Sequence, residues 1–440
     1  MSTTPSDPAP TSSTTSAGAS PEAAAPDSPA GPSGPAGPAS ARATRATAVG
    51  GLLAVLAVSV VALNLRPGAS SLGPLMGDVE AAYDQGATAS GLLTALPCLA
   101  FGVFGALAVP ISRVLGLTGT VVASFVLATL GLLLRPTVDA FALFLILSLL
   151  ALVGPALGNV VVPAWIKQHG AARTVTLLTL YSMMLALGGA AGAGLSVPLA
   201  GPGAEGWRES LQFWGMLAAV PVLIWVLVLV RTGHDFPPPS PAGELRGSLL
   251  RSPTAIALTV MFGLQSTNVY TQFGFLPQVL TSAGISPMRA GVIMAVVLAW
   301  GVVGGLVMPV VVDRSRHLPW IAAGFGALTA IGYLGLWLAP TVSPLLWACV
   351  LGVGGFAFPT VLTLIPLRSR SPLVTARLSG MVQPYGYILA AIGPIIAGAL
   401  LDATGSIPAL LAMMAASGVL LGVVGHRAAR PRMVDDEISA

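Results

Sequence analysis

Charged side chains are scarce in this chain. Asp, Glu, Lys and Arg make up only 8% of its 440 residues, whereas soluble domains carry roughly 25%. Hydrophobic residues make up 55%, and the mean hydropathy is +0.85. A soluble globular protein is therefore excluded, and a chain that lies mostly in a lipid bilayer is indicated.

Residues that carry catalysis or bind metals are also few. The chain has 2 Cys and 4 His, and both Cys98 and Cys349 lie in apolar segments, so they predict neither a disulfide framework nor a metal site. No Asp, Glu or His stands near the middle of an apolar segment. We therefore expect no enzyme, no cofactor and no catalytic or metal-binding residue. A receptor or sensor would need a structured soluble domain, and the sequence predicts none.

Apolar segments of about 20 residues, long enough to cross a bilayer, recur twelve times. The first six lie near 48–76, 89–110, 117–134, 140–165, 174–199 and 211–230. The second six lie near 254–280, 287–311, 319–339, 343–366, 378–401 and 407–425. We therefore expect an all-α membrane protein with twelve transmembrane helices in two six-helix bundles.

The longest polar segment of the chain separates the two sets of six spans, and it defines the domain boundaries that we predict. The expected parts are a disordered cytoplasmic N-terminal tail (1–45), an N-terminal bundle (46–231), a cytoplasmic linker (232–252), a C-terminal bundle (253–426) and a cytoplasmic tail (427–440). The first tail is rich in Pro, Ser, Thr, Ala and Gly, a composition that cannot bury a core.

The loops predict how the chain is oriented. Alternate loops on one side collect sixteen Lys or Arg residues, and those on the other side keep three, Arg135, Arg208 and Arg289. Cytoplasmic loops are the positive ones, so we expect a multi-pass protein of the plasma membrane with both termini in the cytoplasm. Singly scattered basic residues do not favour nucleic acid. The expected partners are the bilayer and a small-molecule solute, and we expect a monomer.

The two halves of the chain resemble each other. A shift of 204 residues places Arg173 on Arg377 and Tyr181 on Tyr385. Internal duplication of this kind is typical of transporters, in which the substrate binds near the midplane where the halves meet.

Twelve spans in a six-plus-six duplication resemble the major facilitator superfamily. Within it, several segments resemble the cyanate and 2-nitroimidazole permease family: Leu-Asn-Leu-Arg-Pro at 63–67, Gly-Asn-Val-Val-Val-Pro at 158–163, Gly-Trp-Arg at 206–208, Leu-Ser-Gly-Met at 378–381 and Asp-Ala-Thr-Gly at 402–405. The resemblance implies the major facilitator fold and a secondary transporter that works by alternating access.

The superfamily's loop signature, Gly-x-x-x-Asp-Arg-x-Gly-Arg, is degenerate in this chain. The first copy keeps Gly105 and Arg113 but has Val109 where the acid would stand, and the second copy keeps Asp313 and Arg314. The resemblance implies a gating role for these four polar or glycine positions, with a weaker case for a gating ion pair in the first half.

Arg66 is the only basic residue deep within an apolar segment. Placing an arginine at mid-bilayer costs about 2.5 kcal/mol or far more, and Arg66 lies roughly ten residues, or about 15 Å, from the outer end of its span. Pro67 and Gly68 follow and favour a break in the helix. A guanidinium suits a planar or oxyanionic ligand, so we expect Arg66 to bind substrate. The alternative is that it reaches toward the interface or caps carbonyls of a broken helix.

The corresponding span of the second half carries amides instead. Gln265, Asn268 and Gln272 share one helical face, with Tyr270 beside them. Such side chains line water or hold helices together, and both possibilities remain open. The other expected substrate contacts, for which packing is an equal alternative, are Asn64, Asn159, Tyr181, Gln383 and Tyr387.

These residues predict the kind of solute. With one arginine and neutral polar groups opposite it, a monovalent anion or a polar neutral molecule fits better than a dianion. A proton relay normally needs a titratable group within the spans, and Asp402, near the outer end of the eleventh span, is the only marginal candidate. Facilitated diffusion, exchange and proton coupling through the substrate therefore stay open. We therefore expect a transporter of a small anionic or polar planar solute, and the family resemblance implies a solute like cyanate or a nitroimidazole. The alternatives are an efflux permease for drugs or metabolites and a nitrate/nitrite-type porter.

Overall fold

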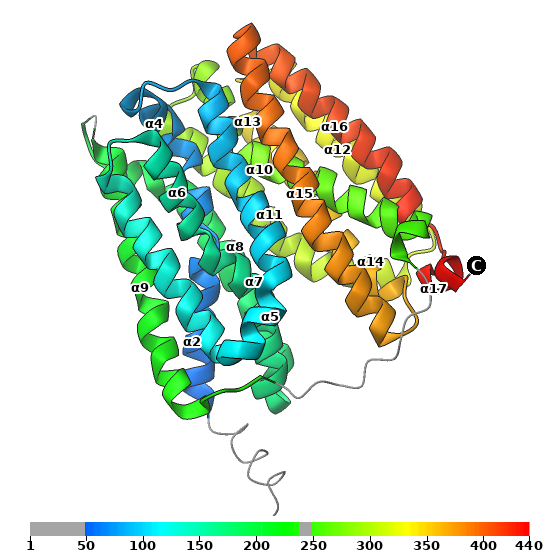
Figure 1. Ribbon diagram of the computed structural model, residues 1–440. Helices are drawn as coiled ribbons and strands as arrows, with labels where there is room; N and C mark the ends of the chain where they lie inside the picture. Colours follow the sequence, from blue (N-terminus) through cyan, green and yellow to red (C-terminus); the bar gives the residue numbers. More distant parts are fainter. Residues whose placement is uncertain (1–48, 204, 237–247, 440) are drawn as a thin grey trace, which may run out of the picture. The chain divides into compact units, whose positions relative to one another are not determined.

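The computed structural model describes residues 49–203, 205–236 and 248–439 (Figure 1). The predicted N-terminal tail, 1–45, lies outside the described residues, as do positions 237–247 of the predicted linker. Every regular element of the described residues is a helix, so the predicted all-α fold is confirmed.

Six spans form the first bundle, and several consist of more than one helix. Their elements are α2 (Gly51–Asn64), α3 (Pro67–Ser70), η1 (Gly73–Leu75), α4 (Met76–Ala82), α5 (Ala87–Leu134), η2 (Arg135–Thr137), α6 (Phe141–Ala151), α7 (Val153–His169), η3 (Ala171–Arg173), α8 (Thr174–Ala200) and α9 (Gly206–Thr232).

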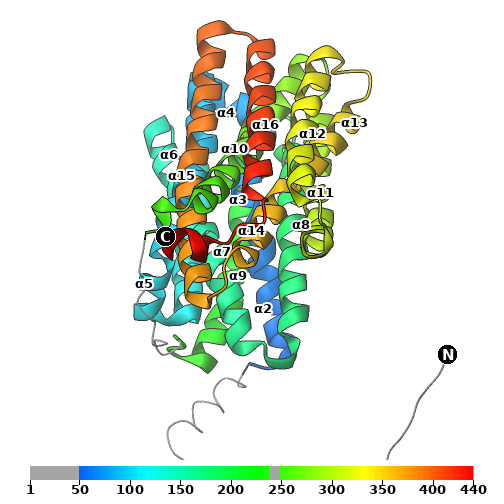
Figure 2. The ribbon, with the colours of Figure 1, turned by 90° about the vertical axis from the view of Figure 1, so that its right-hand side faces the viewer.

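The second bundle follows in the same manner. Its elements are η4 (Leu249–Arg251), α10 (Pro253–Ser282), α11 (Pro287–Arg314), α12 (Leu318–Leu338), α13 (Pro344–Gly354), α14 (Ala357–Leu367), α15 (Pro372–Thr404), α16 (Ile407–Ala428) and α17 (Val434–Ser439). Figure 2 shows α12 and α16 side by side within this bundle.

The helices of the described residues fit the twelve predicted spans, although not all of them meet the same limit of apolarity. Among the described residues, 10 helical segments are long and apolar enough to cross a membrane. One of them contains α5, which is interrupted at Gly116 (φ 78°, ψ 167°) and so supplies two spans. The 30-residue α10 adds the last one, and its low hydropathy reflects the buried amides Gln265, Asn268 and Gln272.

The internal duplication is visible in matching helix breaks. The fourth span is divided into α6 and α7 at Leu152, and the tenth into α13 and α14 at Gly355 and Phe356. The first span is broken at Leu65 and Arg66, whereas its counterpart α10 is continuous. The halves therefore differ at the position where the sequence places the arginine.

The two bundles pack tightly at one end, where α5 runs beside α15 (Figure 1). A Cβ at Gly91 would meet the Pro394 carbonyl oxygen at 2.5 Å, and one at Gly398 would overlap the Ala87 carbonyl oxygen. The Asp402 carboxylate accepts hydrogen bonds of 2.7 Å from the backbone N–H groups of Ala87 and Thr88. Because these are the first N–H groups of α5, the carboxylate caps that helix across the two bundles.

The predicted C-terminal tail, 427–440, contains a folded element. The N–H of Val434, at the start of α17, donates to the Arg368 carbonyl at 2.9 Å. The Glu437 carboxylate accepts hydrogen bonds from the N–H (3.0 Å) and hydroxyl (2.8 Å) of Thr254 at the start of α10. This short helix therefore packs against the second bundle.

A buried acid closes the first bundle at the end opposite Asp402. Asp235 is 8% exposed and accepts hydrogen bonds from the N–H (2.9 Å) and hydroxyl (2.6 Å) of Thr118 and from His169 Nε2 (3.0 Å). The helix break at Gly116 leaves the Thr118 N–H without a partner in its own helix. A Cβ at Gly116 would lie 2.8 Å from the Asp235 carboxylate. Glycine is required both for the positive φ and for this close approach.

Replacing Asp235 by Asn is expected to lower the free energy of unfolding by about 1–3 kcal/mol, since it removes hydrogen bonds to a charged acceptor. Burial raises the pKa of Asp235, but the hydrogen bonds from His169 and Thr118 outweigh burial and hold it below its ordinary value of 3.8. The stabilisation is therefore complete above that ordinary value and is lost as pH falls through the lower folded pKa.

Thermal unfolding of the parent and of Asp235→Asn in detergent at pH 7 measures this difference, and a series at lower pH should show it shrinking. Asp84→Asn, an exposed acid of the same bundle, is the matched control. Equal unfolding midpoints for Asp235→Asn and Asp84→Asn at pH 7 would exclude a stabilising role for the buried carboxylate.

Candidate functional site

A cavity of about 460 Å³ lies between the two bundles. The first bundle contributes the break after α2, together with α7 and α8, and the second contributes α10, α11 and the segments α13 to α15. Nine of the ten predicted substrate contacts line it: Arg66, Asn159, Tyr181, Gln265, Asn268, Tyr270, Gln272, Gln383 and Tyr387. The structure therefore brings together residues that are up to 321 positions apart in sequence.

Asn64 is placed differently from the expectation, because it does not line this cavity. It is 6% exposed, and its side-chain amide donates to the Val60 carbonyl at 2.9 Å. Two positions along a helix turn the side chain by about 200°, so Asn64 and the following arginine cannot share a face. Asn64 therefore lies outside the cavity of this conformation, and its predicted contact with substrate stays a prediction.

The helix break predicted from Pro67 and Gly68 is present. Arg66 has φ −112° and ψ −35° and precedes α3, which begins at Pro67. The arginine is half-buried and lines the cavity, and its guanidinium forms no hydrogen bond or ion pair with another described residue. Its donors are therefore available to a ligand, and the described lining residues contain no other charged side chain.

Glycines of α8 let that helix approach the broken span and so fix the backbone around Arg66. A Cβ at Gly188 would overlap the Leu63 carbonyl oxygen, and one at Gly192 would lie 2.9 Å from the Pro67 Cα. Gly189 faces Arg66 itself, since a Cβ at Gly189 would lie 3.5 Å from the arginine Cβ. The contacts at Gly188 and Gly192 involve backbone atoms, which cannot move away by changing a rotamer.

Gly188→Ala is accordingly expected to lower the transport rate by about tenfold or more, because overpacking of roughly 1–3 kcal/mol must displace the break that carries Arg66. Uptake into proteoliposomes, normalised to the amount of inserted protein, measures the loss. Gly194→Ala is the matched control on the same helix, since a Cβ there would lie an ordinary 3.4 Å from Ala295. Equal losses in both variants would exclude this positioning role.

The amides on the opposite wall are partly engaged in packing. Gln272 donates through Nε2 to the Tyr333 hydroxyl of α12 at 2.7 Å, and Asn268 accepts through Oδ1 from the Ser417 hydroxyl of α16 at 3.0 Å. Both residues therefore hold α10 to neighbouring helices as well as lining the cavity. The Gln265 Oε1 is buried without a hydrogen-bond partner among the described residues, which makes it the amide most in need of a ligand or water.

The remaining polar residues of the cavity have local partners. The Tyr181 hydroxyl donates to Asn159 Oδ1 at 3.1 Å, and Asn159 Nδ2 donates to the Pro155 carbonyl at 2.9 Å. Gln383 Nε2 donates to the Ser379 hydroxyl at 2.8 Å. These contacts fix the orientation of the side chains, and a ligand would have to share or exchange them.

An aromatic cluster lies at one wall of the cavity, where its members Tyr270 and Tyr387 line the space, and the sequence predicted only these two members. Tyr270 and Tyr387 pack with Phe101 and Phe262, and the Phe262–Tyr387 ring centroids lie 4.9 Å apart. Phe101 and Phe262 carry no signal in the sequence, because single phenylalanines are ordinary in membrane helices. The wall offers π-faces to a planar solute.

The four loop-motif residues lie away from the cavity. Gly105 is part of α5, and Arg113, Asp313 and Arg314 are exposed. None of these three charged side chains forms an ion pair within the described residues. Their predicted gating role stays a prediction.

Arg135 lies in the segment between two spans to which the sequence assigned it, but its burial was not predicted. It follows α5 in η2, is 0% exposed, and donates through Nη1 to the Gly68 carbonyl of the broken first span at 3.1 Å. Its burial could not be predicted, because an arginine at the end of an apolar segment usually extends its side chain to the membrane interface.

Two helical bundles around a shared cavity, with 10 helical segments of the described residues able to cross a membrane, are the architecture of a membrane transport protein. Residues 47–394 match the family model of the Major Facilitator Superfamily, and the chain belongs to this superfamily. The fold and the family predicted from the sequence are thereby confirmed, and so is the expectation that the protein is not an enzyme.

Curated relatives narrow the comparison within the superfamily. The transporter YycB of Bacillus subtilis strain 168 is 33% identical, with 85% of this chain and 92% of the relative covered. The 2-nitroimidazole transporter of Escherichia coli strain K12 is 31% identical (85% and 95%). The cyanate transport protein CynX of the same strain is 29% identical (79% and 89%).

The fold is also similar to solved transporters. A bacterial homolog of the human lysosomal transporter Spinster superposes with a TM-score of 0.68 at 16% identity, with 87% of this chain and 97% of that chain covered. The nucleoside transporter NupG (D323A mutant) gives 0.69 at 14% identity, with 85% and 99% covered.

Proposed function

We propose that this protein is a secondary transporter of the plasma membrane that carries a small monovalent anion or a polar planar solute by alternating access. Arg66 carries the proposal, because it is the single charged side chain among the described residues that line the central cavity. The names of the Escherichia coli relatives support this range of solutes. Cyanate is a small monoanion, and 2-nitroimidazole is a planar polar heterocycle.

The charge of the site limits the charge of the solute. One guanidinium balances one negative charge, and a dianion would bring a second charge into a cavity that offers only neutral amides and hydroxyls opposite Arg66. Gln265 and the Tyr270–Tyr387 wall would then supply hydrogen bonding and stacking to a planar solute. The 460 Å³ of the cavity is within the usual size of a small-molecule site.

Packing and charge together support one direction of access. The bundles are in backbone contact at the end that holds Asp402, so the cavity would be reached from the other end. That end collects most of the basic loop residues, which supports a cytoplasmic position. In this proposal the chain is open to the cytoplasm, both termini are cytoplasmic, and the loop residues Gly105, Arg113, Asp313 and Arg314 rearrange when it closes.

The mode of coupling is expected to need no carboxylate of the protein. The described residues that line the cavity include no Asp, Glu or His, and arginine does not release its proton at workable pH. This composition supports facilitated diffusion, exchange, or proton movement with the solute itself.

Uptake into proteoliposomes tests the proposal. Cyanate, nitrite, nitrate and 2-nitroimidazole are supplied with and without a pH gradient, beside protein-free liposomes. Saturable uptake of cyanate or 2-nitroimidazole, with each competing against the other and without a required pH gradient, is the expected result. Transport restricted to apolar drugs would contradict the proposal and favour an efflux permease, and transport restricted to nitrate and nitrite would favour the alternative porter.

A further inference from the structure

Arg135 is a buried cation that the central cavity does not use. Its side chain is 0% exposed, and one nitrogen, Nη1, donates to the Gly68 carbonyl at 3.1 Å. The other two nitrogens, Nε and Nη2, are buried and have no hydrogen-bond partner among the described residues. The guanidinium therefore keeps unused donors in a place that bulk water does not reach.

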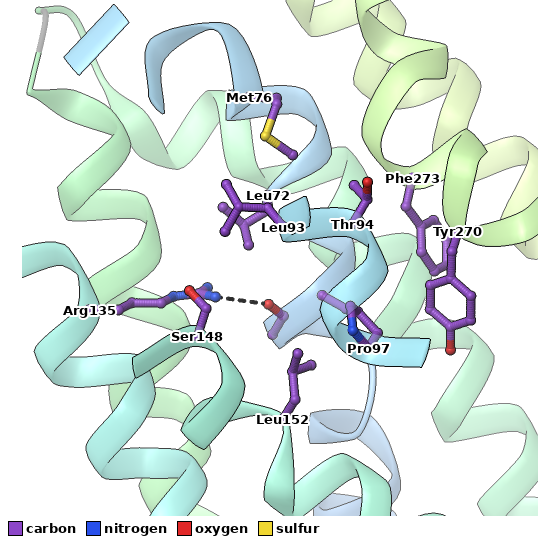
Figure 3. Close-up of a pocket in the computed structure, with 12 residues that line it drawn as sticks. Leu72, Met76, Leu93, Thr94, Pro97, Arg135, Ser148, Leu152, Tyr270 and Phe273 are labelled. Atoms are coloured by element: carbon purple, nitrogen blue, oxygen red, sulfur yellow. Dashed lines mark hydrogen bonds between the residues drawn. The ribbon is translucent and has the colours of Figure 1, made fainter. Parts of the chain in front are cut away.

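A second unsatisfied group lies beside this guanidinium. Ser148 of α6 is 1% exposed, and its hydroxyl has no partner among the described residues. Figure 3 shows the serine side chain and the guanidinium at the same space, with the hydrogen bond from the guanidinium to the first span drawn as a dashed line. Both groups line an enclosed space of about 10 Å³, which is room for one particle of about the size of a water molecule.

Arg135 lacks a counter-charge among the described residues as well as hydrogen-bond partners for two of its nitrogens. None of the ion pairs within the described residues involves it. A buried charge is tolerated when it is paired and hydrogen-bonded, and a single neutral carbonyl supplies little of either. A water molecule in the space would satisfy a donor but would leave the charge unbalanced.

We propose that Arg135 and Ser148 form a second anion site, which holds one small monatomic anion such as a halide. The Nε and Nη2 of the guanidinium and the Ser148 hydroxyl donate to it. The volume excludes a nitroimidazole, so this site differs in selectivity from the cavity around Arg66. An anion bound here would also reinforce the Arg135–Gly68 contact, which holds the first span two residues beyond Arg66.

The walls of this site come from both bundles. Leu93, Pro97 and Leu152 belong to the first bundle, and Tyr270 and Phe273 of α10 belong to the second and also line the central cavity. Separation of the bundles at the Asp402 end would withdraw α10 and open the site. Exchange of the anion would then follow the transport cycle, a step that rests on the proposed alternating access.

Thermal unfolding of the purified full-length protein tests the site. Sodium chloride replaces sodium gluconate at constant ionic strength, and the midpoint is followed as chloride rises. The parent and Arg66→Gln are expected to gain stability with saturation, as for any ligand that binds the folded state. Arg135→Gln should be insensitive to chloride, and Ser148→Ala should need about 3–10 times more chloride, since one hydrogen bond is lost.

Two results would overturn the proposal. A parent midpoint that does not respond to chloride would mean that the space holds water only. A response that disappears in Arg66→Gln but is unchanged in Ser148→Ala would place the anion at the central cavity. Ser148→Ala decides the matter if Arg135→Gln does not fold. Failure of the proposed function is seen separately, in solute uptake by Arg66→Gln.

Discussion

Arg66→Gln is expected to lower the transport of a monovalent anion by about 100-fold. This factor corresponds to roughly 3 kcal/mol, which is the value of one or two charge-assisted hydrogen bonds in a site shielded from bulk water. Glutamine keeps a donor and much of the length but loses the charge. Since the described lining of the cavity offers no other cation, nothing nearby can replace it.

The uptake assay in proteoliposomes measures this loss with cyanate as the anion and 2-nitroimidazole as the neutral solute. Arg66→Lys should recover part of the anion transport, because it keeps the charge without the planar arrangement of donors. The neutral solute should lose less than tenfold in Arg66→Gln, since no full charge is left unbalanced. Arg316→Gln, at an exposed arginine outside the spans, is the matched control.

An Arg66→Gln variant that carries cyanate as fast as the parent would show that the guanidinium is not a substrate contact. The alternative considered from the sequence, an arginine that caps carbonyls of the broken helix, would then apply. Its signature would be a lower unfolding midpoint with unchanged transport per folded molecule. The same two assays therefore separate a binding role from a structural one.

The spans and most of the cavity lining could be predicted because the bilayer penalises polar groups so strongly. A charge or an amide in an apolar segment is tolerated only where it faces a cavity or another helix. This restriction alone selected Arg66, Gln265 and Gln383. The same restriction does not distinguish an amide that binds a ligand from one that forms a hydrogen bond with another helix. Gln272 and Asn268 line the cavity and also bond to Tyr333 and Ser417, which are distant in sequence.

Three features were beyond sequence reasoning for the same physical reason, which is that tertiary contacts decide them. Asn64 points away because its phase on α2 differs from that of Arg66 across the break. Arg135 is buried because α6 and the first span cover the end of α5. Asp235 accepts a hydrogen bond from the Thr118 N–H, 117 residues earlier, and no local pattern marks such a pair.

Gly73→Ala is expected to abolish most transport by preventing closure of the Asp402 end. Gly73 lies in η1 of the first bundle, and a Cβ there would overlap the backbone carbonyl oxygen of Phe273 in α10 of the second. A helix carbonyl cannot move aside by itself, so the clash is relieved only when the two bundles separate. An overpacking cost of about 1–3 kcal/mol would shift the equilibrium toward the opposite state by roughly 5- to 150-fold.

The shift can be measured by labelling a cysteine in the central cavity. Ser182→Cys is suited to this, because Ser182 lines the cavity and is exposed to it, in a background in which Cys98 and Cys349 are replaced by Ala. A membrane-impermeant thiol reagent added from outside the cell should label the parent slowly. The same reagent should label Gly73→Ala about tenfold faster or more, by the population shift, while solute uptake falls by a similar factor.

Gly77→Ala, four residues further along the same span, is the matched control, since a Cβ there would have open space among the described residues. If Gly73→Ala transports and labels like Gly77→Ala, contact between η1 and α10 does not restrain the cycle. Rapid labelling of the parent from outside would instead reverse the proposed orientation, because it would mean that the cavity of this conformation opens outward. A contact that stabilises one conformation also slows the change to the other conformation. The packing at Gly73 is therefore expected to influence the turnover rate of the transporter.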